Sequence, residues 1–403
     1  MSLPKLHIPE YDHRLWILFF GMGLNQFGMS IVMPFISIYL YYYQGISAAL
    51  VGFAIFFSSF IGAIFQLVGG ELCDRIGRRS TFVIGLVTLI ASFLLLAWAV
   101  STKAPYTDYL LILSMTRVAT GLFRPIPNII AADIVPPGKR LEAFALLRIG
   151  QNAGFALGPM VGGVMALLSY SSMFYFTAAT STVYLIIILL FIKDTRTCAP
   201  KNKFTLGDIG NITKDRAFVA FCLLTLFVSV VYSQMYTPLS VYAKGFAGLS
   251  EPEIGMLFAV NGIMVVLMQF VVTRVMDRYS LTGSMGIGVL LYAIGFGLVA
   301  FSNSFLMLGL CVFIVTLGEL SYMPPNTTLT ANMSTEQNRG RYQGFNGLLN
   351  TLGFAIGPLL GGILIDWLGS ATWLIVMASG VLGAIAFLYL KKLVPDEKNN
   401  IAL

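Results

Sequence analysis

Low charge content, long apolar runs and an internal repeat predict an all-α membrane protein with twelve transmembrane helices, arranged as two pseudo-symmetric six-helix bundles. Only 11% of the 403 residues are charged and 57% are hydrophobic, whereas a soluble domain carries about 25% charged residues. Most of the surface therefore has to face lipid. Apolar runs such as 81–100 and 175–192 are long enough to cross a hydrocarbon core of about 30 Å at about 1.5 Å per residue.

The apolar runs between polar breaks predict where the twelve spans lie. The fourth and tenth runs contain prolines and polar residues, which suits helices that face protein and not lipid. The spans are expected near 15–41, 48–69, 81–100, 109–132, 143–167, 172–192, 217–243, 252–273, 284–302, 305–331, 342–365 and 371–390.

The basic residues predict the orientation, because cytoplasmic segments of membrane proteins are enriched in lysine and arginine. With both termini in the cytoplasm, Lys103 and Lys244 lie outside, Arg117, Arg124 and Arg148 lie within spans, and the remaining twenty of the 25 lysines and arginines are cytoplasmic. We therefore expect a multi-pass protein of the plasma membrane with both termini inside.

The two halves of the sequence repeat each other. Residues 117–163 align without gaps on 316–362, so that Pro125 meets Pro324. A second block, around the second and eighth spans, repeats at an offset of 203. Two bundles in the same orientation are a recurring architecture of transport proteins. The predicted division is an N-terminal bundle at 1–192, a cytoplasmic linker at 193–216 and a C-terminal bundle at 217–403.

A charged motif follows the second span. It reads G-E-L-C-D-R-I-G-R-R at 70–79 and resembles the signature G-x-L-x-D-R-x-G-R-R of the major facilitator superfamily, a family of secondary transporters. The resemblance covers the whole chain and implies the major facilitator fold. It also implies that the motif locks the outward-open conformation through Gly70, Asp74, Arg75, Gly77, Arg78 and Arg79.

Glycines form a stripe along the fifth span and again along the eleventh. Small residues four positions apart let helix backbones approach closely in lipid. The first copy resembles the antiporter motif of the superfamily, which favours an exporter over an importer, although two copies also fit plain helix packing. The helix-packing residues are Gly150, Gly154, Gly158, Pro159 and Gly162 in the first copy, and Gly353, Gly357, Pro358 and Gly361 in the second.

A single carboxylate, Glu319, lies well inside a predicted span. Charges at that depth are expensive and are usually functional or paired. The repeat places Glu319 at the position of Thr120, between Arg117 and Arg124, and so directs it toward the face that carries these arginines. We expect Glu319 to be the proton-coupling group and Arg117 to tune it, as the resemblance to drug:proton antiporters implies. The alternative is a buried Glu–Arg pair that holds the two halves together.

Polar and aromatic residues on five spans are candidates for a substrate cavity. Aromatic and methionine side chains suit varied apolar ligands, although each could equally serve helix packing. These candidates are Asn25, Gln26, Met29, Arg124, Arg148, Asn152, Tyr232, Gln234, Tyr236 and Tyr322.

The residues and the resemblance together predict a secondary active transporter that works by alternating access. The preferred function is proton-coupled efflux of amphipathic, often cationic, compounds. Three arginines against one glutamate within the spans leave an anionic metabolite as the alternative cargo. A transport-dead receptor or scaffold is a remote alternative.

The sequence shows no motif of an enzyme or of an ATP-driven motor. The run G-K-R at 138–140 lacks the upstream glycine and the Ser/Thr of a phosphate-binding loop. Both histidines, His7 and His13, precede the first span, and the four cysteines lack metal-ligand spacing. We therefore expect no metal and no cofactor. The expected partners are a small-molecule substrate, protons and the lipid bilayer, without nucleic acid, and the protein is expected to be a monomer.

Overall fold

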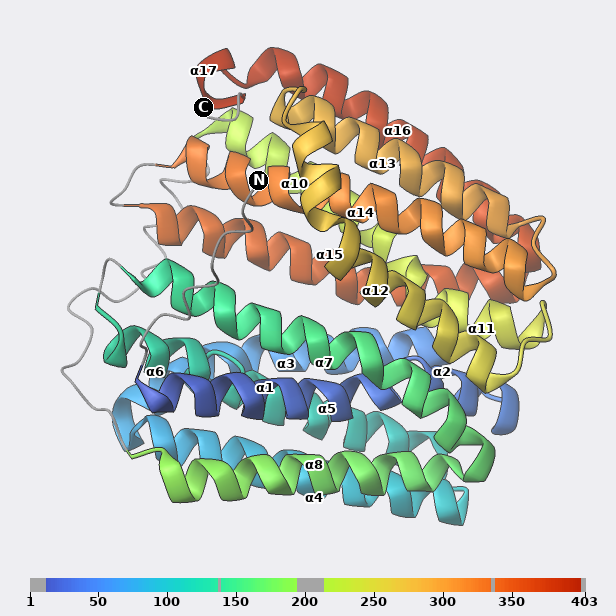
Figure 1. Cartoon of the computed structure of the whole chain (residues 1–403). Helices are drawn as coiled ribbons and strands as arrows, with labels where there is room; N and C mark the ends of the chain where they lie inside the picture. The colour runs from blue at the N-terminus through green and yellow to red at the C-terminus, as the bar shows by residue number, and fades with distance from the viewer. Residues whose placement is uncertain (1–11, 137–138, 194–213, 335–337, 400–403) are drawn as a thin grey trace, which may run out of the picture.

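The computed structural model describes residues 12–136, 139–193, 214–334 and 338–399, and every element in them is helical (Figure 1). The predicted all-α fold is confirmed. The N-half comprises α1 (His13–Val32), α2 (Phe35–Ile38), the π-helix η1 (Tyr39–Tyr43), α3 (Ala48–Ile76), α4 (Arg78–Thr102), α5 (Tyr106–Phe123), α6 (Ile126–Ile134), α7 (Arg140–Leu168) and α8 (Tyr170–Phe191). The C-half comprises α10 (Arg216–Tyr232), the 3-10 helix η3 (Ser233–Met235), α11 (Thr237–Gly245), α12 (Glu251–Met276), α13 (Leu281–Val299), α14 (Phe305–Met333), α15 (Arg339–Leu368), the 3-10 helix η4 (Gly369–Ala371), α16 (Thr372–Leu393) and α17 (Asp396–Asn399).

Ten segments of the described chain are long and apolar enough to cross a membrane. The last of them, Arg341–Leu393, contains both α15 and α16. The predicted fourth span is not among the ten, and it corresponds to α5 and α6, which are separated at Pro125. Proline removes a backbone donor and clashes with the preceding turn, so the helix breaks there. The structure thus agrees with about twelve spans.

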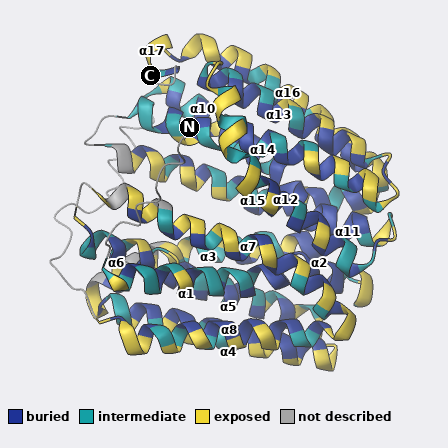
Figure 2. Cartoon of the chain, viewed as in Figure 1, coloured by how far each residue is buried: buried dark blue, intermediate teal, exposed yellow. Residues whose placement is uncertain are grey.

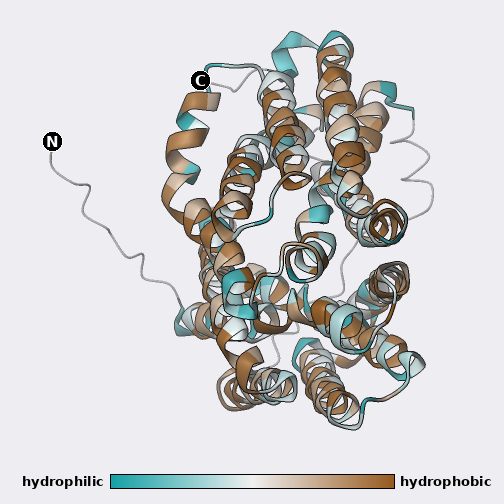
Figure 3. Ribbon diagram, turned by 90° about the vertical axis from the view of Figure 1, so that its right-hand side faces the viewer, coloured by the Kyte–Doolittle hydropathy of each residue, from teal (hydrophilic) through white to brown (hydrophobic). Residues whose placement is uncertain are grey.

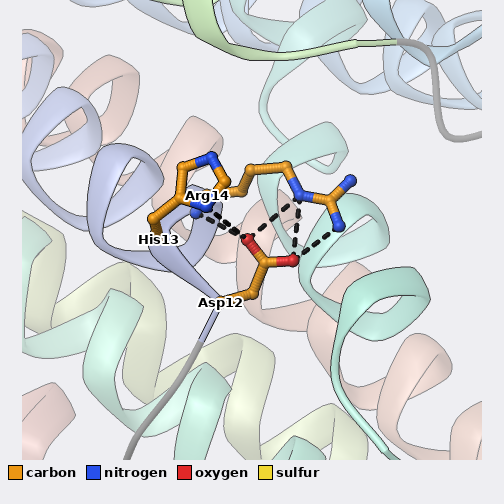
Figure 4. Close-up of polar contacts among 3 residues, drawn as sticks. All are labelled: Asp12, His13 and Arg14. Atoms are coloured by element: carbon orange, nitrogen blue, oxygen red, sulfur yellow. Dashed lines mark hydrogen bonds and ion pairs between the residues drawn. The ribbon is translucent and has the colours of Figure 1, made fainter.

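Helix starts follow the side chains that can accept from free backbone amides. At the start of α1, Asp12 accepts from the backbone N–H of Arg14 at 2.9 Å and from the Arg14 guanidinium (Figure 4). The hydrogen bond from the Arg14 side chain holds the pKa of Asp12 below its usual range. Serine plays the same capping role before five other helices, at Ser47, Ser169, Ser250, Ser280 and Ser304.

Exposed positions run along the outer faces of the helices (Figure 2), and many of them carry large apolar residues. Phe270 is 76% exposed and Leu306 is 80% exposed. Hydrophobic residues run along the helix bodies, and hydrophilic residues gather toward many of the helix ends (Figure 3). Soluble monomers rarely expose such continuous apolar surface, so these faces are the ones that contact lipid.

The two halves lie side by side and meet along two helix pairs, α7 with α12 and α3 with α15 (Figure 1). The internal repeat relates α3 to α12 and α7 to α15, so the two contacts are pseudo-symmetric. Within the N-half, α1 packs on α7 and α8, and within the C-half, α13 packs on α14 and α16. The predicted bundle boundaries and linker at 193–216 stay a prediction, because 194–213 lies outside the described residues.

We call the side where α1 begins and α8 ends the termini side, and the opposite side the far side. The halves approach most closely on the far side. A Cβ added at Gly255 would lie 2.3 Å from the Pro159 carbonyl oxygen, and one at Gly52 would lie 2.2 Å from the Pro358 carbonyl oxygen. Both are contacts between backbones of opposite halves. The structure therefore shows the conformation in which the far side is closed.

Candidate functional site

Glu319 is the middle residue of the 29-residue helix α14 and is partly buried. The Asn261 side chain, from α12, donates a hydrogen bond of 2.8 Å to its carboxylate. The same amide nitrogen lies 3.0 Å from the Thr316 hydroxyl, one turn earlier on α14. Asn261 is only 3% exposed, so the packing of α12 on α14 fixes the direction from which the carboxylate is bound.

Aromatic rings of the C-half surround this carboxylate. Tyr232 and Tyr236 lie within electrostatic range of Glu319, and their rings are 5.9 Å apart. Tyr232 also packs on Tyr292 at 5.1 Å, and Tyr236 stacks on Phe258 at 6.2 Å. Because α10 gives way to the 3-10 turn η3 between these two tyrosines, the seventh span is interrupted at the site. Interrupted helices are where transporters commonly place their binding groups.

A hollow of about 420 Å³ opens beside α7, on the termini side of this region. Ala156 of α7 contacts Gly262 of α12. Arg148 lies eight residues earlier on α7, which places it about 12 Å along the helix axis toward the termini side. Arg148 also interacts electrostatically with Glu319. The hollow is lined by Asn128, Phe144, Leu147, Arg148, Gln151 and Asn152.

The other intramembrane arginines lie within the N-half. Arg117 of α5 packs against α3, because a Cβ at Gly62 would lie 3.0 Å from the Cβ of Arg117. Its charged neighbour is Arg124, a like charge that repels it and that is exposed at the end of α5. Among the hydrogen bonds and ion pairs of the described residues, none joins Glu319 to Arg117. The cation that acts on Glu319 is instead Arg148, from the neighbouring helix α7.

The remaining substrate candidates separate into packed and accessible positions. Asn25 is buried and accepts from the Ser181 hydroxyl at 3.3 Å, so it joins α1 to α8. The Gln234 amide donates to the Gly357 carbonyl at 2.9 Å, which joins η3 to α15. The buried Tyr322 hydroxyl accepts from the Asn326 amide at 3.1 Å. Three others are not fully buried. Gln26 and Met29 are partly exposed, and Asn152 is exposed.

The charged motif at 70–79 forms the junction of α3 and α4. Gly77 has a positive φ of 101°, a conformation that glycine adopts without strain. Arg78 forms an ion pair of 3.0 Å with Asp133 of α6, and Arg79 donates to the Leu189 carbonyl of α8. Both contacts stay within the N-half. Arg75 pairs with Glu71 one turn earlier. The surroundings of Gly70 and of the Asp74 side chain lie outside what the structure describes.

The two glycine stripes face equivalent neighbours in the two halves. A Cβ at Gly154 would lie 2.2 Å from the Gly23 carbonyl of α1. At the repeat-related position, a Cβ at Gly353 would lie 2.4 Å from the Leu226 carbonyl of α10. The same close approach to α1 is made by the rest of the first stripe, Gly150, Gly158 and Gly162. The rest of the second stripe, Gly357 and Gly361, approaches η3. The prolines of the two motifs lie inside the helices, Pro159 in α7 and Pro358 in α15.

Sequence reasoning missed two groups of residues. The first is Asn261, whose signal was a polar amide in the middle of an apolar span. The second is a cluster on the far side, where Glu251 accepts from the Tyr43 hydroxyl at 2.7 Å and the Tyr170 hydroxyl at 3.0 Å, and pairs with Lys244 at 3.1 Å. Glu251 stands at a helix start, where an acid is expected from local rules alone, so nothing in the sequence marked it as a contact between halves.

Solved structures share the fold. The nucleoside transporter NupG superposes with a TM-score of 0.80 at 14% identity, covering 94% of this chain and 100% of that one. A POT family transporter in complex with 5-aminolevulinic acid gives a TM-score of 0.79 at 16% identity, covering 98% and 99%. At these identities the likeness concerns the fold alone.

Sequence relatives are transporters. The chain is 28% identical over 393 residues to the uncharacterized MFS-type transporter YttB of Bacillus subtilis (strain 168), covering 96% of this chain and 97% of that protein. It is 26% identical over 366 residues to the quinolone resistance protein NorA of Staphylococcus aureus (strain MSSA476), covering 88% and 90%. The sequence also matches the profile of the Major Facilitator Superfamily over residues 18–250 and 223–403. The chain therefore belongs to the Major Facilitator Superfamily and is a multi-pass membrane transporter, not an enzyme.

Proposed function

We propose that this transporter is a proton-coupled antiporter that exports amphipathic, often cationic, compounds across the plasma membrane by alternating access. The observation that carries the proposal is the position of Glu319, a carboxylate at the centre of α14 that is bound by Asn261 and surrounded by tyrosine rings. The other expectations, a monomer with its termini and the 193–216 linker in the cytoplasm, belong to the same proposal.

A carboxylate within aromatic rings suits a cationic ligand for two reasons. The negative charge attracts the cation directly, and ring faces attract it with about 0.5–2 kcal/mol each. Tyr232, Tyr236 and Phe258 supply such rings from α10 to α12. A proton on Glu319 would remove the negative charge, so that proton and cation bind in competition. That competition is the requirement for antiport.

The far-side closure supports alternating access. With the termini in the cytoplasm, the far side is extracellular, and the hollow beside Arg148 and Asn152 opens toward the cytoplasm. An exporter loads its substrate from that side. The relative NorA is named a quinolone resistance protein, which favours a drug-like substrate here.

A second candidate function rests on the same hollow. Arg148 brings a positive charge to it, and three amide side chains, Asn128, Gln151 and Asn152, can donate hydrogen bonds. Such a group of donors fits an anionic metabolite. The carboxylate of Glu319 lies close enough to oppose an anion electrostatically, which is why we place the cationic substrate first.

The two candidates differ in the charge of the transported compound. Purified protein in proteoliposomes is offered benzyltrimethylammonium or phenylmethanesulfonate, two compounds with the same ring and permanent opposite charges. The membrane potential is clamped with potassium and valinomycin. The proposal predicts accumulation of the cation when the lumen is acidic, and none without a pH gradient. Gradient-driven accumulation of the sulfonate alone would support the anion transporter instead.

A further inference from the structure

We propose that Asp366 stabilises the far-side-closed conformation by capping α3 from the opposite half. We call the contact of Asp366 with the first amides of α3 the far-side latch. This inference rests on alternating access, and it does not depend on which substrate or ion is carried.

The latch consists of two hydrogen bonds across the boundary between the halves. The Ala48 and Ala49 backbone N–H groups donate to the two carboxylate oxygens of Asp366, at 3.0 Å and 2.7 Å. Ala48 and Ala49 are the first residues of α3, so their amides have no acceptor within their own helix. The third amide, of Leu50, is bound by Ser47 at 3.3 Å. The carboxylate therefore binds amides that α3 leaves free, at the positive end of its dipole.

The latch can form only when the far side is closed. Gly362 lies one turn before Asp366, and a Cβ added there would lie 2.1 Å from the Ala48 carbonyl oxygen. Gly52 lies one turn after Ala48, and its added Cβ would lie 2.2 Å from the Pro358 carbonyl oxygen. Backbones this close separate by several ångströms when the far side opens. Water then replaces the carboxylate at the amides, and the charge-assisted bonds are lost.

The helices α3 and α15 run antiparallel, and each carries an aspartate two residues before its last residue. These are Asp74 in α3, which ends at Ile76, and Asp366 in α15, which ends at Leu368. Because the helices are antiparallel, the end of α15 lies beside the start of α3, and Asp366 reaches the first amides of α3 on the far side.

The pseudo-symmetric pair α7–α12 lacks this arrangement, so the latch is not a by-product of the repeat. The position equivalent to Asp366 is Leu167, which is 64% exposed. The position equivalent to Ala48 is Glu251, which bonds Tyr43 and Tyr170 of the N-half through its own side chain. At the α3–α15 boundary the far-side carboxylate that bonds the opposite half is Asp366 of α15. At the α7–α12 boundary it is Glu251 of α12.

The test measures the ratio of far-side-closed to far-side-open molecules. Spin labels are attached at Thr102→Cys and Asn303→Cys, two exposed far-side positions in opposite halves, after the native cysteines are replaced. Double electron–electron resonance on the full chain in lipid nanodiscs then gives the two distance populations without any substrate. Asp366→Asn is expected to shift the ratio about tenfold toward the long distance, as loss of a charge-assisted bond implies.

Two further variants separate the latch from general damage. Asp108→Asn is the matched control, because Asp108 is a far-side acid in the first turn of α5 whose hydrogen-bond partner, Thr107, lies on the same helix. It should leave the ratio unchanged. Ala48→Pro removes one donor without touching Asp366. Proline is tolerated at the first helical position, and Ser47 has the extended conformation that precedes proline, with φ −56° and ψ 149°. This variant should shift the ratio in the same direction by a smaller factor.

The motif at 70–79 is expected to lock the outward-open conformation, so Asp74→Asn should shift the ratio the opposite way, and the Asp74→Asn/Asp366→Asn double variant should return near the wild-type value. The proposal is overturned if Asp366→Asn changes the ratio no more than Asp108→Asn does, or if Asp366→Asn shifts it toward the short distance. If Asp366→Asn does not fold, an unchanged ratio in Ala48→Pro overturns it. Because no substrate or pH gradient is present, failure here leaves the proposed cargo and coupling untouched.

Discussion

Asn261 of α12 donates a hydrogen bond of 2.8 Å to the carboxylate of Glu319 on α14, and the same amide nitrogen lies 3.0 Å from Thr316. The three side chains lock two helices of the C-half around one acid. A carboxylate in this setting is oriented as well as buried. Its protonation is thereby tied to the relative position of α12 and α14, and α12 is one of the helices that meet the N-half.

Replacement of Asn261 by leucine should reduce gradient-driven transport about tenfold, because the carboxylate loses the donor that orients it and hydrogen bonds to charged groups contribute about 1.5–3 kcal/mol. Leucine keeps a similar volume, so the helix packing should survive. Proteoliposome uptake measures the effect. Gln269→Leu is the control, since the Gln269 amide bonds Thr273 on its own helix and the Leu320 backbone carbonyl of α14, but not the Glu319 carboxylate. Equal losses in both variants would show that Asn261 has no special relation to Glu319.

Tryptophan at Gly255 should prevent closure of the far side. A Cβ there would already lie 2.3 Å from the Pro159 carbonyl oxygen, so an indole can be accommodated only if α7 and α12 separate. We expect transport to fall at least about tenfold and the far-side distance between spin labels to become uniformly long. Gly347→Trp is the control, because a Cβ at Gly347 meets nothing within 4 Å. A Gly255→Trp protein that still closes would contradict the assignment of this boundary.

Cys198 should be protected from an impermeant maleimide in intact cells and should be labelled after permeabilisation, because the basic-residue distribution predicts a cytoplasmic linker. Cys198 lies outside the described residues. The other three cysteines, Cys73, Cys222 and Cys311, are buried, so they contribute little background. Efficient labelling of intact cells would reverse the proposed orientation, and with it the direction in which the hollow beside Arg148 opens.

Replacement of Asp74 by asparagine should lower flux several-fold while the protein remains folded and inserted. The charge at the end of α3 biases the conformational equilibrium, and helix-end charges contribute about 0.3–1 kcal/mol, up to about 2 kcal/mol in favourable geometry. Flux in proteoliposomes, normalised to protein that elutes as a single species, measures the effect. Glu71→Gln is the comparison, since Glu71 is an exposed acid one turn earlier whose partner is Arg75. Unchanged flux in Asp74→Asn would remove Asp74 from the transport cycle.

The sequence was sufficient for the fold, and it singled out the residue on which the proposed function rests. Hydropathy identified nearly every span, because length and apolarity are strict requirements in lipid. It also singled out Glu319, because charge within a span is rare. Pro125 lies at the break between α5 and α6, whereas its repeat equivalent Pro324 lies inside the continuous helix α14, so proline alone did not decide where the helices end.

The partners of these residues could not be predicted in the same way. The repeat directed Glu319 toward Arg117, yet Arg117 packs beside Gly62 within the N-half, and Arg148 is the cation near Glu319. Repeat symmetry tells which residue of one half corresponds to which residue of the other half. It does not tell how the two halves are placed relative to each other in a given conformation. Asp366 was overlooked for a similar reason, since its contact with Ala48 crosses 318 positions of sequence and exists only where the halves meet.

The central claim is that Glu319 couples proton movement to substrate movement, and the most direct measurement is uptake of benzyltrimethylammonium into clamped proteoliposomes that contain Glu319→Gln. Glutamine keeps the shape of the side chain but cannot release a proton. The account predicts that accumulation driven by an acidic lumen is abolished in a stable, monodisperse protein, while Glu319→Asp retains part of it. If the glutamate only pairs with an arginine, Glu319→Gln should instead destabilise the protein, and Arg148→Gln should restore both stability and flux. Full gradient-driven accumulation by a stable Glu319→Gln protein would contradict the coupling role.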